Sequence, residues 1–241
     1  MQPSSVLAGP FNVNDAFVAN ELSGTPTDPN GVYTYGYTFT PANVAALDTT
    51  GLVHTTAFFG STGLQGYYIP NNAIVPAVLG NVTNAPITTG FGVTVQPGEL
   101  LLHPGGTSGD AFAPPVADAD LRYTAPVASL ATISGVFSTL SSGSTDVHVF
   151  INGISAFDAN IAQGQSAAFN FTTALAANDK VDFLVGPSTD GIGSDSTGLF
   201  ANISIANISI ATPEPSVVIP ALIGIGGALG YGLRRRKTMT V

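Results

Sequence analysis

Short segments that alternate apolar and polar positions recur along most of the chain. Between residues 10 and 212 these segments are rich in β-branched and aromatic residues, Gly, Pro and Asn separate them, and helical periodicity is nearly absent. This pattern predicts strands over the ranges 31–40, 52–60, 65–70, 91–96, 98–103, 119–124, 129–139, 145–152, 166–173, 179–185 and 198–210. A short helix is expected only at 41–48.

The segment TDVHVFI, residues 145–151, has the plainest alternation. Its two valines and its isoleucine fall on one face of a strand, and its Asp, His and Phe fall on the other. Asn152-Gly153 follows as a tight hairpin turn, with 154–157 returning as the partner strand. Asn178-Asp179 is a second turn signal, placed before the strand that begins VDFLV.

About ten strands at these spacings predict an all-β fold, a jelly-roll-like two-sheet β-sandwich. We expect one sandwich domain over 9–211, preceded by a short segment, 1–8. The Pro/Gly-rich stretch 104–115 is interpreted as a long loop across the sandwich, with a domain boundary as the alternative. The tandem repeat ANISIANISI, 201–210, predicts a strand with a bulge or bend at the repeat junction.

The amino-acid composition excludes several kinds of functional site and partner. The chain has 241 residues and no Cys, which excludes thiol catalysis, disulfides and cysteine metal sites. Before Pro213 there are 14 acidic residues and two basic ones, Arg122 and Lys180, a net charge of 2 − 14 = −12. Such a body repels nucleic acid, so no nucleic-acid partner is expected. Its Thr, Ser, Asn and Gly content is typical of an exported bacterial protein.

The C-terminal segment differs from the rest of the chain. Residues 216–233 carry no charge, and 18 residues of helix span about 27 Å, enough to cross a hydrocarbon core. The basic run 234–237 follows as a stop that stays in the cytoplasm. We therefore predict a single C-terminal transmembrane helix. A buried core helix is the alternative, disfavoured by the four cations at its end and the five Gly inside it.

A sorting motif brackets this helix. Pro213, Glu214 and Pro215 precede it, and Arg234, Arg235 and Arg236 follow it, an order that resembles the PEP-CTERM sorting signal of Gram-negative bacteria. The resemblance assigns 212–241 as the signal. It implies export, a transient inner-membrane intermediate, cleavage by an exosortase near Pro-Glu-Pro, and delivery to the cell surface or extracellular matrix. Residues 1–20 have neither the basic residues nor the apolar run of a secretory leader. We expect a leader to precede them, through a misassigned start or a fragmentary sequence, with export by another route as the alternative.

Six short motifs in the body carry a second resemblance. They are Pro29-Asn30-Gly31 with Tyr35-Gly36-Tyr37, Leu102-His103-Pro104-Gly105, the run 122–126, the run 145–149, Asn152-Gly153, and the run 195–199. Their order is similar to that in a group of secreted bacterial β-sandwich proteins, many of which bear PEP-CTERM signals. The resemblance implies a sandwich like those of carbohydrate-binding modules. Tyr123 stands where that group commonly has Trp.

Four tyrosines are candidates for binding sugar. Proteins bind sugars through the flat faces of aromatic rings together with hydrogen-bonding side chains. Tyr33, Tyr35 and Tyr37 lie at period two, so all three face one side of a strand, and Tyr123 is the fourth candidate. On a solvent face these rings would form a stacking platform for a glycan. On a core face they would be packing.

Acidic loops offer candidate ligands for a structural calcium ion, which prefers several oxygen ligands. Asp190 and Asp195 lie in STDGIGSDSTG, and Asp118 and Asp120 lie in VADAD. Ordinary turn chemistry is the alternative for both segments. His54, His103 and His148 lie far apart in sequence and are interpreted as structural histidines rather than a transition-metal pair.

No catalytic motif is present. The chain has no HExxH, P-loop or GxSxG, and no GxGxxG that opens a helix, and Asp118 with Asp120 is the only close carboxylate pair. We therefore expect an exported, exosortase-sorted surface or matrix protein with a non-catalytic β-sandwich, associated with exopolysaccharide. The alternative is a dedicated carbohydrate-binding module with a defined glycan ligand, and the third is a secreted glycan-active enzyme. The expected partners are the exosortase, the secretion machinery and exopolysaccharide.

Overall fold

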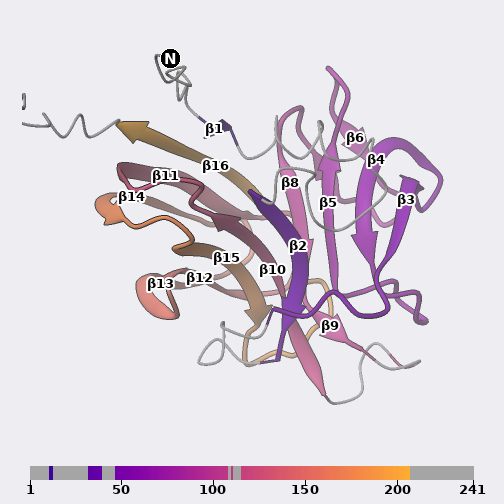
Figure 1. Cartoon of the computed structure of the whole chain (residues 1–241). Coiled ribbons are helices and arrows are strands. Elements are labelled where there is room, and N and C mark those ends of the chain that lie inside the picture. The colour runs from indigo at the N-terminus through magenta and orange to yellow at the C-terminus, as the bar shows by residue number, and fades with distance from the viewer. Residues whose placement is uncertain (1–10, 13–31, 40–46, 108–109, 111–114, 207–241) are drawn as a thin grey trace, which may run out of the picture. The chain divides into compact units, whose positions relative to one another are not determined.

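Two β-sheets packed face to face form the body of the protein (Figure 1). The computed structural model describes residues 11–12, 32–39, 47–107, 110 and 115–206. All of them lie in a unit that spans Met1–Asn207. The predicted two-sheet all-β sandwich is confirmed for these residues.

The first sheet has eight strands in the order β14-β11-β16-β8-β5-β4-β3, with β1 beside β16. In chain order its strands are β1 (Phe11–Asn12), β3 (Val53–Phe58), β4 (Ser61–Tyr68), β5 (Ala77–Asn81), β8 (Leu100–His103), β11 (Ser129–Thr139), β14 (Ser166–Leu175) and β16 (Thr197–Ala206). Strand β11 pairs antiparallel with both β14 and β16, and Ile133 lies opposite Ile203 of β16.

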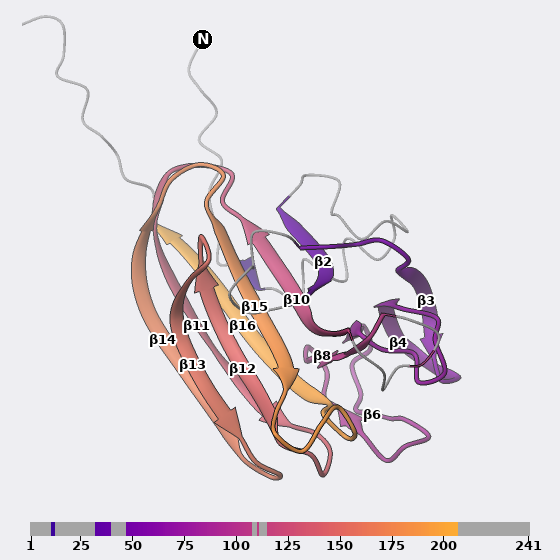
Figure 2. The same ribbon diagram turned by 90° about the horizontal axis from the view of Figure 1, so that it is seen from below.

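The second sheet has six strands in the order β13-β12-β15-β10-β2, with β9 beside β10. Its strands are β2 (Tyr33–Thr38), β9 (Gly105–Gly106), β10 (Val116–Thr124), β12 (Thr145–Ile151), β13 (Ile154–Ile161) and β15 (Lys180–Pro187). A separate hairpin joins β6 (Ile87–Thr88) to β7 (Thr94–Val95). Figure 2 shows the strands of the two larger sheets as two layers.

The main core lies between the two layers because each strand turns alternate side chains inward. Strand β10 contributes Ala119, Leu121 and Tyr123, and β11 contributes Ile133 and Phe137 from the facing sheet. A second apolar cluster forms around β4, β5 and β8, with Leu64, Leu79, Leu101, Val75, Val93, Val95 and Phe58 among its members. Apolar burial on this scale is the main term that stabilises a domain of this size.

Several predicted elements differ from the structure. Strand β5 was not predicted, and β10 begins at Val116 instead of residue 119. The stretch interpreted as a long loop, 104–115, contains β9, which pairs with β10. The predicted helix 41–48 lies outside the described residues except for its end, where Asp48 pairs with Tyr37 as extended backbone.

The C-terminal predictions fall where the structure describes nothing. Strand β16 pairs with β11 as far as Ala206 without a register shift, and the rest of the repeat lies outside the described residues. The sorting motif and the predicted transmembrane helix, 213–237, lie outside them too. Among the residues that are described, no helix is both long enough and apolar enough to cross a membrane.

Candidate functional site

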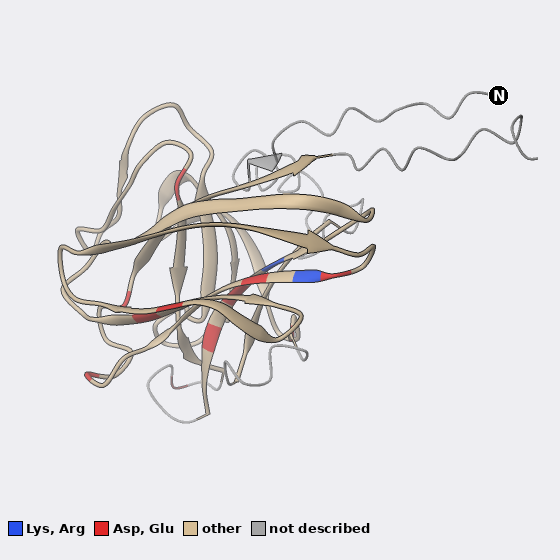
Figure 3. Ribbon diagram, turned by 90° about the vertical axis from the view of Figure 1, so that its left-hand side faces the viewer, with Lys and Arg blue, Asp and Glu red and all other residues tan. Residues whose placement is uncertain are grey.

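The outer face of the six-stranded sheet is unusually acidic. In β10 the sequence ADADLRY alternates, so Ala119, Leu121 and Tyr123 enter the core while Asp118, Asp120 and Arg122 point to the other face. The neighbouring strands add Asp182 on β15, Asp146 and His148 on β12, and Asp158 on β13. Figure 3 shows these acidic positions along neighbouring strands. The sheet therefore gathers carboxylates that are far apart in sequence.

Asp118 and Asp120 are mid-strand residues, so the alternative of turn chemistry is wrong for them. The Asp118 carboxylate occupies the space beside Gly186 that a side chain would fill. A Cβ added to that glycine would be only 2.6 Å from Asp118 Oδ1. Gly186 is the residue of β15 that pairs with Asp146 of β12. Because Gly186 has no side chain, the Asp118 carboxylate can point toward Asp146. Burial, and next the charge of Asp146, raise the pKa of Asp118 to about 7.

The guanidinium of Arg122 binds Asp182 and acts on Asp120 through its charge alone. Arg122 Nε donates to Asp182 Oδ1 at 2.5 Å, and both side chains are buried. Asp120 is fully buried, and neither carboxylate oxygen has a hydrogen-bond partner among the described residues. Burial and the charge of Asp182 raise the pKa of Asp120 well above its ordinary value, and Arg122 opposes the shift. Burial also raises the pKa of Asp182, with Arg122 again opposing it.

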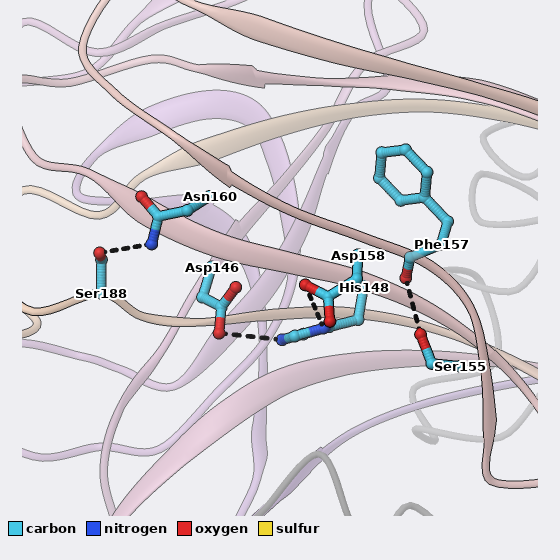
Figure 4. Close-up of polar contacts among 7 residues, drawn as sticks. All are labelled: Asp146, His148, Ser155, Phe157, Asp158, Asn160 and Ser188. Atoms are coloured by element: carbon cyan, nitrogen blue, oxygen red, sulfur yellow. Dashed lines mark hydrogen bonds and ion pairs between the residues drawn. The ribbon is translucent and has the colours of Figure 1, made fainter.

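A histidine lies between two aspartates at one edge of this face (Figure 4). His148 Nε2 is 3.1 Å from Asp146 Oδ2, and His148 Nδ1 is 3.5 Å from Asp158 Oδ1. One possible ligand atom from each of the three residues lies within 4.8 Å of the others. These are contacts at ion-pair distance, and neither ring nitrogen makes a hydrogen bond of good geometry to a described residue. The three side chains form a possible acidic metal site.

The second pair of calcium candidates lies apart from the first, in the segment between β15 and β16. Asp190 accepts hydrogen bonds from Ser144 N at 3.0 Å and Ser144 Oγ at 2.8 Å, which hold its pKa below the ordinary value. Asp195 is buried, and its burial, then the charge of Asp190, raise its pKa to about 7. The Ser194 carbonyl faces the same place and accepts from Gly143 N at 2.9 Å. Asp195 is near enough to Asp190 for the charge of Asp190 to act on it, and calcium binding there stays a prediction.

The candidate tyrosines lie in the interior. Tyr35 stacks on Tyr67 with ring centroids 5.6 Å apart, and Tyr33 packs against Tyr123 at 5.5 Å. Tyr37 is also buried, and its hydroxyl donates to the Thr50 carbonyl. Their ring faces contact other side chains because the inner faces of the strands need large residues to fill the space between the sheets. The predicted sugar platform on these residues is therefore wrong, and core packing is the correct alternative.

An aromatic cavity that the sequence analysis missed lies beside the second apolar cluster. It has a volume of about 390 Å³, and three phenylalanines line it. Phe58 and Phe59 come from the β3–β4 hairpin, and Phe91 comes from the β6–β7 hairpin. Phe59 and Phe91 meet edge to face at 4.5 Å, yet Phe91 is 71% exposed and Phe59 is 39% exposed. These two large apolar side chains thus form an open wall.

The backbone at Phe59 is strained. Phe58 pairs with Ser61, so Phe59 and Gly60 form a two-residue turn, with φ values of 48° and 72°. Such turns favour Asn-Gly, and a bulky side chain in this region of φ is an outlier of the kind found at ligand-binding sites. The only sequence signal was Phe-Phe-Gly inside one predicted strand, 52–60. The chain thus keeps an aromatic ring at the cavity, at a backbone position where Asn or Gly would be more stable.

The polar groups of the cavity are neutral. His103 Nδ1 donates to the Pro104 carbonyl at 2.6 Å, and burial lowers the pKa of this histidine, which keeps it uncharged at neutral pH. Thr89 is buried, and its hydroxyl has no hydrogen-bond partner among the described residues. Asn72 and Ser141, Ser194 and Ser196 complete the polar part of the lining, and no Asp or Glu is among the described residues that line the cavity. The site can hold a ligand that has both an apolar face and hydroxyl groups.

Comparison with known proteins gives likenesses in structure alone. No protein-family model matches the chain, and no curated protein matches it. The chain is similar to the carbohydrate-binding module CBM51 from Clostridium perfringens GH95 in complex with methyl-galactose, at 14% identity and a TM-score of 0.33, covering 51% of this chain and 81% of that one.

Two further solved structures resemble the sandwich. One is CBM51-2 in complex with GlcNAc and INT domains from Clostridium perfringens ZmpB, at 8% identity and a TM-score of 0.35, covering 67% of this chain and 29% of that one. The other is the module CBM36 in complex with calcium and xylotriose, at 12% identity and a TM-score of 0.27, covering 44% and 79%. The function of this chain is argued below from its own residues.

Proposed function

We propose that the β-sandwich is a non-catalytic module that binds a neutral glycan in the cavity of Phe58, Phe59 and Phe91. The observation that carries this proposal is the wall of exposed aromatic rings, one of which is maintained in a strained turn. A sugar ring has an apolar face of C–H groups and a rim of hydroxyls. Phenylalanine rings suit the face, and neutral donors and acceptors such as Asn72 and His103 suit the rim.

The charge of the cavity supports binding over hydrolysis. Glycoside hydrolysis ordinarily uses a pair of carboxylates that flank the bond to be broken. The described residues that line the cavity include neither Asp nor Glu. The acidic residues Asp118 and Asp120 lie on the outer face of the other sheet, in β10. A neutral ligand also avoids the repulsion that this acidic body would exert on an anionic glycan.

Truncation of Phe91 tests this function. Because most of its ring is exposed, Phe91→Ala should leave the unfolding free energy unchanged while it weakens binding to exopolysaccharide oligosaccharides of the producing strain. A lost ring contact of about 1–2 kcal/mol corresponds to roughly a tenfold rise in Kd, measured by calorimetric titration. Phe200→Ala is the matched control, since Phe200 is 39% exposed but lies in β16 outside the cavity lining.

A variant of the strained turn, tested in the same calorimetric titration, provides a second test of glycan binding. Phe59→Asn replaces the ring with a residue that favours positive φ, so it should stabilise the protein by about 1 kcal/mol while it weakens glycan binding. Full glycan affinity in both Phe91→Ala and Phe59→Asn would contradict the proposal. So would a loss of affinity in Phe200→Ala of the same size.

We further propose, from the sequence motifs alone, that Pro213–Pro215 and Arg234–Arg236 sort the protein through the inner membrane to an exosortase. The body would then reach the cell surface or matrix of a Gram-negative bacterium, where exopolysaccharide supplies the glycan. A fusion of residues 205–241 to a reporter should move that reporter into the membrane fraction. A fusion that stays soluble in the cytosol would contradict this part of the proposal and leave glycan binding intact.

A further inference from the structure

Side chains of β10, β12 and β13 that the glycan cavity does not use form a second site. We propose that Asp146, His148 and Asp158 bind a divalent transition-metal ion of the Zn²⁺ type, with Asp118 facing it from β10. The site lies on the face of the six-stranded sheet opposite to Val147 and Val149, which are in the core. Figure 4 shows His148 between the two aspartates. It contains none of the residues that line the aromatic cavity.

The strand register brings the three ligands together. Asp146 and His148 lie two residues apart on β12, so they share one face, and His148 is directly opposite Asp158 of β13. Atoms bound about 2.0–2.2 Å from a tetrahedral zinc ion lie roughly 3.3–3.5 Å from each other. His148 contacts the two aspartates through different ring nitrogens, with Nε2 at 3.1 Å from Asp146 and Nδ1 at 3.5 Å from Asp158, and one imidazole gives a single nitrogen to an ion. One ligand atom from each of the three residues lies within 4.8 Å of the others, so side-chain rotations that shorten these separations would complete the site.

Two buried groups point to a missing cation. Asp118 is 5% exposed, its Oδ2 has no hydrogen-bond partner among the described residues, and it lies over Gly186 toward Asp146. His148 is also 5% exposed, and its ring nitrogens lack hydrogen bonds of good geometry. Buried polar groups are ordinarily paired, so these two require a partner. A metal ion bound to the imidazole would pair His148 directly, and its positive charge would act on Asp118 from the neighbouring strands.

No Lys or Arg among the described residues is left to fill this role. Residues 1–212 contain only two basic side chains, Arg122 and Lys180. Arg122 is bound to Asp182, and Lys180 lies at the opposite end of β15 from Gly186. The negative charge of Asp118, Asp146 and Asp158 is therefore uncompensated by Lys or Arg.

The ligand types decide which metal fits. An imidazole nitrogen with carboxylate oxygens suits Zn²⁺ and related transition metals, whereas Ca²⁺ takes six to eight oxygen ligands and no nitrogen. The all-oxygen group at Asp190 and Asp195 is where calcium would be expected instead. The two regions can thus be distinguished by metal type.

The experiment titrates the metal-free full-length chain with Zn²⁺ in competition with a chromogenic chelator. We expect one ion per chain, and an affinity at least tenfold weaker in both His148→Gln and Asp158→Asn. The side chain of Asp158 is 65% exposed, so its amide variant stays folded whatever happens to His148→Gln. His54→Gln is the matched control, because His54 packs on Tyr67 away from the cluster, and it should leave the affinity unchanged.

The visible absorption of bound Co²⁺ distinguishes metal binding by His148 from a purely structural role of this residue. Co²⁺ bound by one imidazole and carboxylates should absorb in the visible range, and the band should vanish in His148→Gln. Equal Zn²⁺ affinity in the wild-type chain, His148→Gln and Asp158→Asn would overturn the proposal. Displacement of Zn²⁺ by equimolar Ca²⁺ would overturn the transition-metal assignment.

Discussion

Replacing Tyr35 with alanine should destabilise the protein by about 3–5 kcal/mol, as expected for the loss of a large aromatic side chain from a core. Tyr35 has no exposed surface, and its ring stacks on Tyr67 within the main core between the sheets. The truncation leaves a cavity that the facing strands cannot close, because β2 is fixed by its pairing with β10. Urea unfolding followed by fluorescence or circular dichroism measures the effect.

The control for this prediction is Tyr35→Phe, which keeps the ring and removes only the hydroxyl. It should change the unfolding free energy by less than about 1 kcal/mol, because the ring that fills the core and stacks on Tyr67 is kept. The pair of variants also separates core packing from sugar binding. If Tyr35→Ala left the unfolding free energy unchanged but abolished glycan binding, the tyrosine would belong to a binding surface after all.

The faces of individual strands could be predicted from sequence, but the partners across strands could not. The alternation in 145–151 assigns Val147 and Val149 to one face, and both lie in the main core. It assigns Asp146 and His148 to the other, where they form the acidic cluster. Alternation does not say whether a face of amphipathic aromatic residues meets the core or the solvent. The tyrosines of β2 show this ambiguity, because their rings suit both core packing and sugar stacking.

Register explains why Asp158 escaped prediction. Asn152-Gly153 forms the expected hairpin turn, with Ile151 opposite Ile154. An unbroken ladder from that pair would place Phe157 opposite His148. A bulge between Val149 and Phe150 shifts the register by one residue and places Asp158 there instead. A bulge of this kind leaves no reliable mark in a single sequence.

The aromatic cavity and strand β5 were missed for different physical reasons. The residues of β5, AVLGN, are all buried, so they show no alternation that would mark them as a strand. The turn at Phe59-Gly60 was hidden because the chain uses Phe where a turn residue is usual. A residue that the local backbone does not favour is expected at a functional site, because ligand binding can require a side chain that the turn itself would not select.

The second large effect is expected at Arg122. Replacing it with methionine leaves Asp182 and Asp120 buried without the guanidinium that binds Asp182, and loss of one partner from a buried pair costs about 3–5 kcal/mol. Burial already raises the pKa of both carboxyls, and removal of the guanidinium would raise each pKa further. The effect on the free energy of unfolding is therefore expected to depend on pH.

The direction of that dependence follows from proton binding. With a raised pKa, each folded carboxyl holds its proton over a pH range where the unfolded chain has lost it, so stability falls as pH rises through that range. The penalty in Arg122→Met should be largest at about pH 8 and smaller at about pH 5, where more of the buried carboxyls are protonated. Urea unfolding of the variant and the wild type at both pH values measures the difference.

Lys180→Met provides the matched control, because it removes the other cation of β15 and β10 from a half-buried position. It should change the unfolding free energy by less than about 1 kcal/mol, as for a weakly paired surface charge. An equal loss at both pH values in Arg122→Met would mean that the apolar stem of the arginine, and not its charge, stabilises this face. A loss that grows with pH would mean that one guanidinium is what allows the carboxylates of β10 and β15 to lie buried side by side.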